Sequence, residues 1–141
     1  MSDSLPPELV IDAGPIIGAV DSRDQHHAVS ARGLRLLYDS TTRVRIPVPI
    51  LFEAYKRIAY RIDVRSARAA LTYMRDAFEL EYLDEARLLE VEGLIDTMPR
   101  WQGSLEDATL AWLGLERRVP VWTFNYRDLR HFTDLQFWNP V

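Results

Sequence analysis

Three acidic side chains stand at places in the sequence where a strand gives way to a helix. Asp12 comes directly after a short apolar run, and Glu53 lies just inside the helical stretch that follows a second apolar run. Asp107 lies in the first turn of a later helical stretch that begins after Ser104, which has the position of an N-cap. In an open α/β sheet such junctions lie at one edge, so we expect these carboxylates to converge although they are far apart in the chain.

Clustered carboxylates without thiols favour a hard divalent cation. The chain has no cysteine, which excludes thiolate metal sites, disulfides and cysteine nucleophiles. Oxygen ligands suit Mg²⁺ or Mn²⁺, and an ion so held lowers the pKa of a bound water and neutralises charge on a phosphodiester. We therefore expect these acids to hold a metal ion, with either Asp107 or its neighbour Glu106 contributed by the later helix, and we expect hydrolytic cleavage of phosphodiesters.

Several other α/β chemistries lack the residues that they need. Lys56 is the only lysine, so the chain has no phosphate-binding loop of the G-x-x-x-x-G-K type, and it has no G-x-G-x-x-G dinucleotide signature. It also has no G-x-S-x-G elbow for a serine hydrolase. Aspartyl-phosphate phosphatases need an Asp-x-Asp pair where this chain has Asp-Ala-Gly at 12–14. A phosphotransfer enzyme with Asp12 as nucleophile is therefore a remote alternative.

Basic residues gather in one stretch of an acidic chain. The net charge is −4, which argues against nucleic-acid binding by bulk electrostatics. Between positions 54 and 75 arginines dominate, and four of them are spaced 4, 4 and 3 residues apart: Arg57, Arg61, Arg65 and Arg68. They share one helical face if a single helix runs through Asp63. Two interpretations stay open, a solvated helix face and a phosphate-contacting stripe beside Glu53.

The elements that must position these side chains alternate between strands and helices. Expected strands are 9–11, 44–48, 78–83, 119–123 and 135–138, and expected helices are 27–38, 50–61, 65–77, 85–97 and 105–117, with Asp84 and Ser104 as caps. This pattern predicts a three-layer α/β/α domain with a central, mainly parallel sheet. A length of 141 residues suits a single domain, 1–141, that starts with a polar extension over residues 1–8.

The sequence shows no sign of membrane insertion or export. No apolar run approaches the roughly 18 to 20 uncharged residues that a membrane span needs. The polar start, MSDSLPPEL, lacks the charged and then apolar pattern of a signal peptide. We expect a cytoplasmic protein with no membrane partner.

Four segments carry a further signal through their order and spacing: VIDAGPIIGAVDSRDQHHA, PVPILFEAYKRI, GSLEDATLAWLGLERRVPVWT and FNYRDLRHF. Together they resemble the PIN-domain ribonucleases, and within them the VapC-type toxins of bacterial toxin–antitoxin pairs. The resemblance implies a PIN-like fold and an endoribonuclease that hydrolyses RNA phosphodiester bonds with Mg²⁺ or Mn²⁺. It also implies a small antitoxin protein that wraps and inhibits the domain, and pairing of the domain as a homodimer.

One position departs from the family pattern. The family's first three acids fall on Asp12, Glu53 and Asp107, so the resemblance implies these three as metal ligands and favours Asp107 over Glu106. Its fourth acid falls on Asn125, which keeps a carbonyl acceptor and lacks the negative charge. If the fourth acid mainly orients a metal-bound water, its loss costs on the order of 10- to 100-fold. Asp128 can bring a carboxylate to the same water if the segment after Asn125 is helical. The catalytic set is therefore Asp12, Glu53, Asp107, Asn125 and Asp128, and the RNA-binding arginines are Arg57, Arg61 and Arg127.

Structural explanations compete with each of these assignments. Asp12 has the position of a turn or helix cap, and Glu53 that of an acid favoured by a helix dipole. Adjacent His26 and His27 point in different directions from a helix start, so we expect structural or surface roles for them. The alternative function is a catalytically weakened PIN-fold module that binds RNA or protein, with Asn125 marking the loss of catalysis. Three remaining acids favour the enzyme, because like charges packed together destabilise a protein that holds no cation.

Overall fold

The computed structural model describes residues 5–140. The elements in this part of the chain are β1 (Glu8–Ile11), α1 (Ala13–Val20), α2 (His27–Tyr38), β2 (Arg43–Pro47), α3 (Val48–Arg61), α4 (Val64–Ala77), β3 (Glu79–Glu81), α5 (Glu85–Asp96), α6 (Leu105–Arg117), β4 (Val121–Trp122) and α7 (Tyr126–Leu129). The strands form one sheet in the order β3-β2-β1-β4, and every pair is parallel. This confirms the predicted α/β architecture with a parallel sheet.

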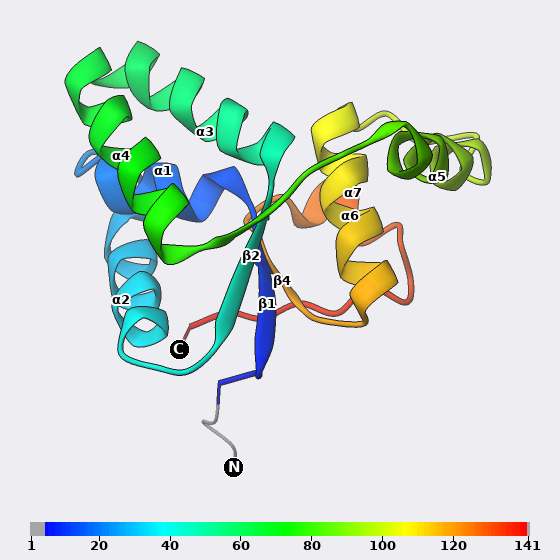
Figure 1. Ribbon diagram of the computed structural model, residues 1–141, viewed down its shortest axis with the longest axis horizontal. Coiled ribbons are helices and arrows are strands. Elements are labelled where there is room, and N and C mark those ends of the chain that lie inside the picture. Colours follow the sequence, from blue (N-terminus) through cyan, green and yellow to red (C-terminus); the bar gives the residue numbers. More distant parts are fainter. Residues whose placement is uncertain (1–4, 141) are drawn as a thin grey trace.

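Helices cover both faces of the sheet (Figure 1). Helices α1 to α4 lie on one side, and α5 and α6 lie on the other. The apolar side chains of β1 are fully buried between these layers, as expected for a central parallel strand. The carboxyl ends of β1 and β4 therefore open at an edge that the first turns of α1 and α6 also reach.

Two short helices were not predicted from the sequence. Helix α1 begins directly after β1, where a glycine-containing turn was expected, and Pro15 lies in its first turn, where a missing N–H costs nothing. Asp12 is its N-cap and accepts a hydrogen bond from the backbone N–H of Ala13 at 2.7 Å. Helix α7 follows β4 and carries Asp128, which meets the condition that the segment after Asn125 be helical.

Two other sequence-based expectations differ from the structure. The predicted strand at 135–138 is wrong, because this segment makes only an isolated bridge, between Phe137 and Val121. The condition for a four-arginine face is not met either. Helix α3 ends at Arg61, and the carboxylate of Asp63 caps α4 by accepting from the backbone N–H of Ser66 at 2.7 Å. The chain therefore starts a new helix where a continuous one was needed.

A buried arginine lies within the central strand β2. The guanidinium of Arg45 is 2.7 Å from carboxylate oxygens of Glu8 and Glu79 and 3.0 Å from Glu81. These contacts join β1, β2 and β3 away from the edge described above. An apolar run at 44–48 did not reveal this network, because the partners of Arg45 come from distant strands.

The first strand overlaps the polar extension that was expected at residues 1–8. Strand β1 begins at Glu8, within the segment expected as a polar extension, and residues 1–4 of that extension lie outside the described residues. Within residues 5–140, none of the helices has the length and hydropathy of a membrane span.

Candidate active site

All eight predicted site residues line one cleft of about 490 Å³, which we call the acidic cleft. It opens where β1 and β4 end and where α1, α3, α6 and α7 meet. The acids and the amide that line it are Asp12, Asp24, Glu53, Asp107, Asn125 and Asp128. Arginines at its wall are Arg57, Arg61 and Arg127, and the remaining lining is Gly14, Ile17, Gln25, His26, Ser104 and Phe124. Segments from both ends of the chain thus build one site.

Asp12 is the most buried acid of the cleft, with 5% of its surface exposed. One carboxylate oxygen accepts from the backbone N–H of Ala13, and the other accepts from the Thr123 hydroxyl at 2.7 Å. Burial raises the pKa of Asp12 to about 6, and the neighbouring charges of Asp107 and Glu53 push in the same direction. Two hydrogen bonds therefore hold this carboxyl group in place. Its ionised form is unfavourable in these buried surroundings, and a bound cation would offset that free-energy cost.

Glu53 and Asp107 face the same cleft from α3 and α6. Burial raises the pKa of each, and the negative charge of Asp107 adds to the effect on Glu53. The guanidinium of Arg57, one helical turn further along α3, lies 3.3 Å from the carboxylate of Glu53. The hydroxyl of Ser104 caps α6 by accepting from the backbone N–H of Asp107 at 3.0 Å, so the predicted cap is confirmed. The acids are thus preorganised by the helices that carry them.

Asn125 connects two of the carboxylates. Its side-chain amide donates to Asp107 at 3.1 Å and to Asp128 at 3.2 Å, and its backbone N–H donates to the Thr123 hydroxyl at 2.9 Å. Since Thr123 in turn donates to Asp12, one chain of hydrogen bonds runs from Asp12 to Asp128. An amide suits this place in the absence of a cation, because a fourth ionised carboxylate could donate no such bonds and would repel its neighbours.

The arginines of the cleft are paired with acids. Arg57 contacts Glu53 at 3.3 Å, and Arg61 contacts Asp24 at 3.0 Å. Arg127 is the most exposed, with 85% of its side chain accessible. Arg65 and Arg68, on α4, are exposed and do not line the cleft. Only the part of the arginine stripe on α3 therefore belongs to the site.

The side chains of the acidic cleft offer the kind of oxygen ligands that a hard cation binds. Carboxylate and amide oxygens are ligands that Mg²⁺ and Mn²⁺ accept. Among residues 5–140, however, no three acidic or histidine side chains are already arranged as a cation site. In this structure Thr123, Arg57 and Asn125 instead contact Asp12, Glu53 and Asp107, respectively.

Solved structures share this fold at low sequence identity. The toxin VapC20 of Mycobacterium tuberculosis superposes with a TM-score of 0.76 and 15% identity, covering 88% of this chain and 94% of that one. VapBC-1 of nontypeable Haemophilus influenzae gives 0.69 and 18%, with 94% and 97% covered, and VapBC2 of Rickettsia felis gives 0.69 and 12%, with 94% and 98% covered. This chain has the VapC fold. Comparison of the sequence with protein-family models and with curated proteins found no match.

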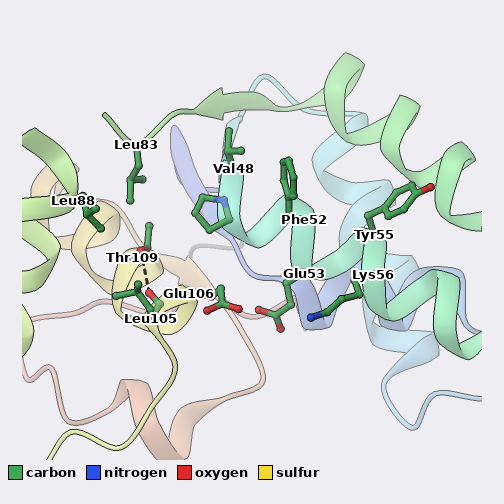
Figure 2. A pocket seen from close by; sticks show the side chains of 11 residues that line it. Val48, Phe52, Glu53, Tyr55, Lys56, Leu83, Leu88, Leu105, Glu106 and Thr109 are labelled. Carbon is green, nitrogen blue, oxygen red and sulfur yellow. Dashed lines mark hydrogen bonds between the residues drawn. The ribbon is translucent and has the colours of Figure 1, made fainter. Parts of the chain in front are cut away.

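A second hollow lies beside the acidic cleft of this VapC fold (Figure 2). This apolar groove of about 610 Å³ is lined mainly by Val48, Pro49, Phe52, Tyr55, Leu83, Leu88 and Leu105. Glu53 borders both hollows, whereas Glu106 lines the groove and not the cleft. The choice of Asp107 over its neighbour Glu106 therefore agrees with which hollow each one faces.

Three residues that line the acidic cleft were not predicted from the sequence as site residues: Asp24, His26 and Phe124. Asp24 accepts a hydrogen bond from the backbone N–H of His26 at 2.8 Å. It also pairs with Arg61, which no local pattern indicated. His26 and Phe124 stack on each other at the cleft wall, while His27 turns away and contacts the carbonyl of Gly18 through Nδ1 at 2.8 Å. The different directions of the two histidines were predicted, but the stack was not.

Proposed function

We propose that this protein is a divalent-metal-dependent endoribonuclease that hydrolyses RNA phosphodiester bonds, and that it is the toxin of a toxin–antitoxin pair. The observation that carries the proposal is the convergence of Asp12, Glu53 and Asp107, from three distant segments, in one cleft walled by arginines. The VapC fold supports the toxin assignment, because VapC20 is described as a toxin that cleaves the sarcin–ricin loop. The raised pKa values in the cleft support a bound cation, which would offset the repulsion.

The three acids would hold Mg²⁺ or Mn²⁺ through their carboxylate oxygens. When bound, such an ion lowers the pKa of water and neutralises charge that develops on the phosphodiester. Asp12 is fixed by two hydrogen bonds and is the rigid member of the set. Glu53 and Asp107 are half-buried on helices and complete the set from opposite sides of the sheet.

The arginines would bind the phosphates that flank the bond to be cut. Arg57 and Arg61 lie on one face of α3 beside Glu53, and Arg127 projects from α7 on the other side of the acids. Guanidinium groups bind phosphate oxygens through paired N–H donors. This arrangement would let the RNA backbone run across the acids although the whole chain is acidic.

Asn125 and Asp128 would serve as positioning residues. Asn125 holds Asp107 and Asp128 together through its amide, and Asp128 supplies the negative charge that Asn125 lacks. We propose that Asp128 takes over part of the role of the family's fourth acid. Its place on α7, one turn from Asn125, allows it to do so.

An antitoxin and a second copy of the chain are the proposed protein partners. Several structures with the same fold are toxin–antitoxin complexes, including one from Klebsiella pneumoniae that covers 94% of this chain at 14% identity and a TM-score of 0.66. Co-expression with any small protein encoded next to this chain, followed by pull-down, tests the first partner. Sedimentation velocity of the purified chain tests the homodimer, and a monomer at all concentrations would contradict it.

The first experiment is a calorimetric titration of Mn²⁺ and Mg²⁺ into the purified protein, because it needs no knowledge of the RNA. We expect saturable binding that Asp12→Asn and Asp107→Asn abolish. Glu106→Gln is the matched control, since Glu106 shares the first turn of α6 with Asp107 but faces the other hollow. It should retain binding.

Cleavage is then tested on total RNA and on a synthetic sarcin–ricin loop, with Mn²⁺ or with a chelator. We expect products only with the metal and only from variants that bind it. A folded protein that binds no Mn²⁺ at millimolar concentration would sink the enzyme proposal and favour the RNA- or protein-binding module. Cleavage that persists in Asp12→Asn would contradict the assigned site.

A further inference from the structure

Two aromatic rings form a stack at the wall of the acidic cleft. The centroids of His26 and Phe124 are 3.9 Å apart, and their planes differ by 14°. His26 precedes α2 and Phe124 follows β4, so the stack joins two segments from opposite ends of the chain. Both residues line the cleft together with the acids and arginines.

The ring pair is held from both sides. The backbone N–H of His26 donates to Asp24 at 2.8 Å, which fixes the loop that carries the imidazole. A methyl group built on Gly14 would lie 3.3 Å from Phe124 Cδ2, so the phenyl ring rests against the start of α1. Phe124 is also flanked by Thr123 and Asn125, which belong to the hydrogen-bond chain of the cleft. The rings are therefore preorganised next to the acids.

Helix capping does not explain the position of the imidazole. His26 has the N-cap place of α2 but makes no side-chain capping hydrogen bond. Both rings are only half-buried. The ring pair is therefore partly exposed in a cleft whose other walls carry mainly charges and amides.

We infer that His26 and Phe124 form a subsite that stacks one nucleobase of the bound nucleic acid, with the base lying on the imidazole and Phe124 supporting it from behind. The inference rests on the proposed function, because it assigns the base next to the phosphate that the acids and arginines hold. Stacking on aromatic rings is the common way to hold an unpaired base, and every base has a face for it. Gln25 lines the same cleft and carries an amide that can pair with the edge of the base.

The test compares two small probes that differ only in the base. Adenosine 5′-monophosphate and ribose 5-phosphate are titrated into the metal-free protein, and the ring-proton signals of His26 and Phe124 are followed by NMR. We expect the nucleotide to shift these signals upfield through its ring current and to bind roughly 5- to 150-fold more tightly than the sugar phosphate.

Variants separate stacking from a structural role. His26→Ala and Phe124→Leu should reduce the affinity for the nucleotide to that for the sugar phosphate, whereas His26→Tyr keeps a ring face and should retain the preference. Phe52→Leu is the matched control, because Phe52 is exposed in the apolar groove and not in the cleft. Circular dichroism and the affinity for ribose 5-phosphate report whether each variant keeps its fold.

Equal affinity for the two probes, or ring signals that stay unchanged up to the solubility of the nucleotide, would overturn the subsite. So would an unaltered preference in both His26→Ala and Phe124→Leu. These outcomes are distinct from failure of the proposed function, which is read from metal-dependent cleavage by the unmodified protein. Cleavage without base preference rejects the subsite alone, and base preference without cleavage rejects the nuclease alone.

Discussion

The carboxylate of Asp12 caps α1 and also faces the cleft. Capping explains why an aspartate follows β1, since the Ala13 N–H needs an acceptor. It does not explain why the other oxygen bonds to Thr123 in a site where burial, with a smaller contribution from Asp107 and Glu53, raises the pKa of Asp12 to about 6. Capping therefore explains one oxygen of Asp12, and the proposed role in holding a cation would account for the free-energy cost of burying the charged group.

The pKa of Asp12 predicts how stability depends on pH in the metal-free protein. Because the folded state holds this proton more tightly than the unfolded chain, protonation stabilises the fold, and the free energy of unfolding falls as the pH rises from about 4 through 6. The rise from 3.8 to about 6 corresponds to about 3 kcal/mol for this group. Urea unfolding at several pH values, with a chelator present, measures the slope. Asp12→Asn should reduce it, and an unchanged slope would contradict the assignment.

Asn125→Asp should restore the fourth acid of the cleft. At neutral pH we expect Mn²⁺ affinity or cleavage activity to rise about 10- to 100-fold, because the added carboxylate completes the negative site. Without metal the same variant should be less stable, since its charge would face Asp107 and Asp128 without the present hydrogen bonds. Calorimetry and urea unfolding measure the two effects. Gln102→Glu adds the same charge outside the cleft and should change neither Mn²⁺ affinity nor metal-free stability. An equal gain in Mn²⁺ affinity from Gln102→Glu would show that the net charge of the protein, and not the cleft, causes the effect.

At the scale of elements, the break between α3 and α4 divides the arginines into two groups. Arg57 and Arg61 line the cleft, and Arg65 and Arg68 belong to the next helix. We expect Arg57→Ala and Arg61→Ala each to weaken binding of single-stranded RNA and to lower its salt dependence by about one counterion. Arg65→Ala and Arg68→Ala are the matched controls and should change little. Fluorescence anisotropy at several salt concentrations measures the RNA affinity of each variant. Equal losses of affinity from the α3 pair and the α4 pair would support RNA binding along all four arginines.

The buried arginine of β2 predicts a stability difference between two neighbours in one strand. Arg45 is 8% exposed at its side chain and has three acidic partners, whereas Arg43 is 60% exposed and pairs with Glu79. Arg45→Ala should lower the free energy of unfolding by about 3 kcal/mol, because it removes a buried guanidinium that pairs with three carboxylates and leaves the buried Glu81 with fewer partners. Arg43→Ala should lower it by less than about 1 kcal/mol. Similar losses in urea unfolding would show that burial of the network is unimportant.

At the scale of the whole molecule, metal binding and folding should be linked. A ligand that binds only the folded state adds about 2.7 kcal/mol of stability at a hundred times its dissociation constant. We expect Mn²⁺ to raise the melting temperature, and to raise it more at pH 7 than at pH 5, since protons compete for Asp12. Differential scanning fluorimetry with and without a chelator checks this. A rise that also occurs in Asp12→Asn would place the ion elsewhere.

The sequence by itself determined the layers of the fold and the acids of the site. Periodic apolar runs, caps such as Ser104 and the place of Asp12 after a strand are local signals, because hydrogen bonds and burial within a few residues produce them. Short elements escaped this reasoning. Helix α1 contains Gly14 and Pro15, and the 135–138 segment has the composition of a strand but makes only one bridge.

Only the tertiary structure decided which side chains meet. The bridging amide of Asn125, the pairing of Arg61 with Asp24 and the partners of Arg45 all join residues from different elements. The stack of His26 on Phe124 does so too. Spacing along a chain reports the face of a helix or strand on which a residue lies. It does not report what packs against that face, because this depends on how the helices cross the sheet.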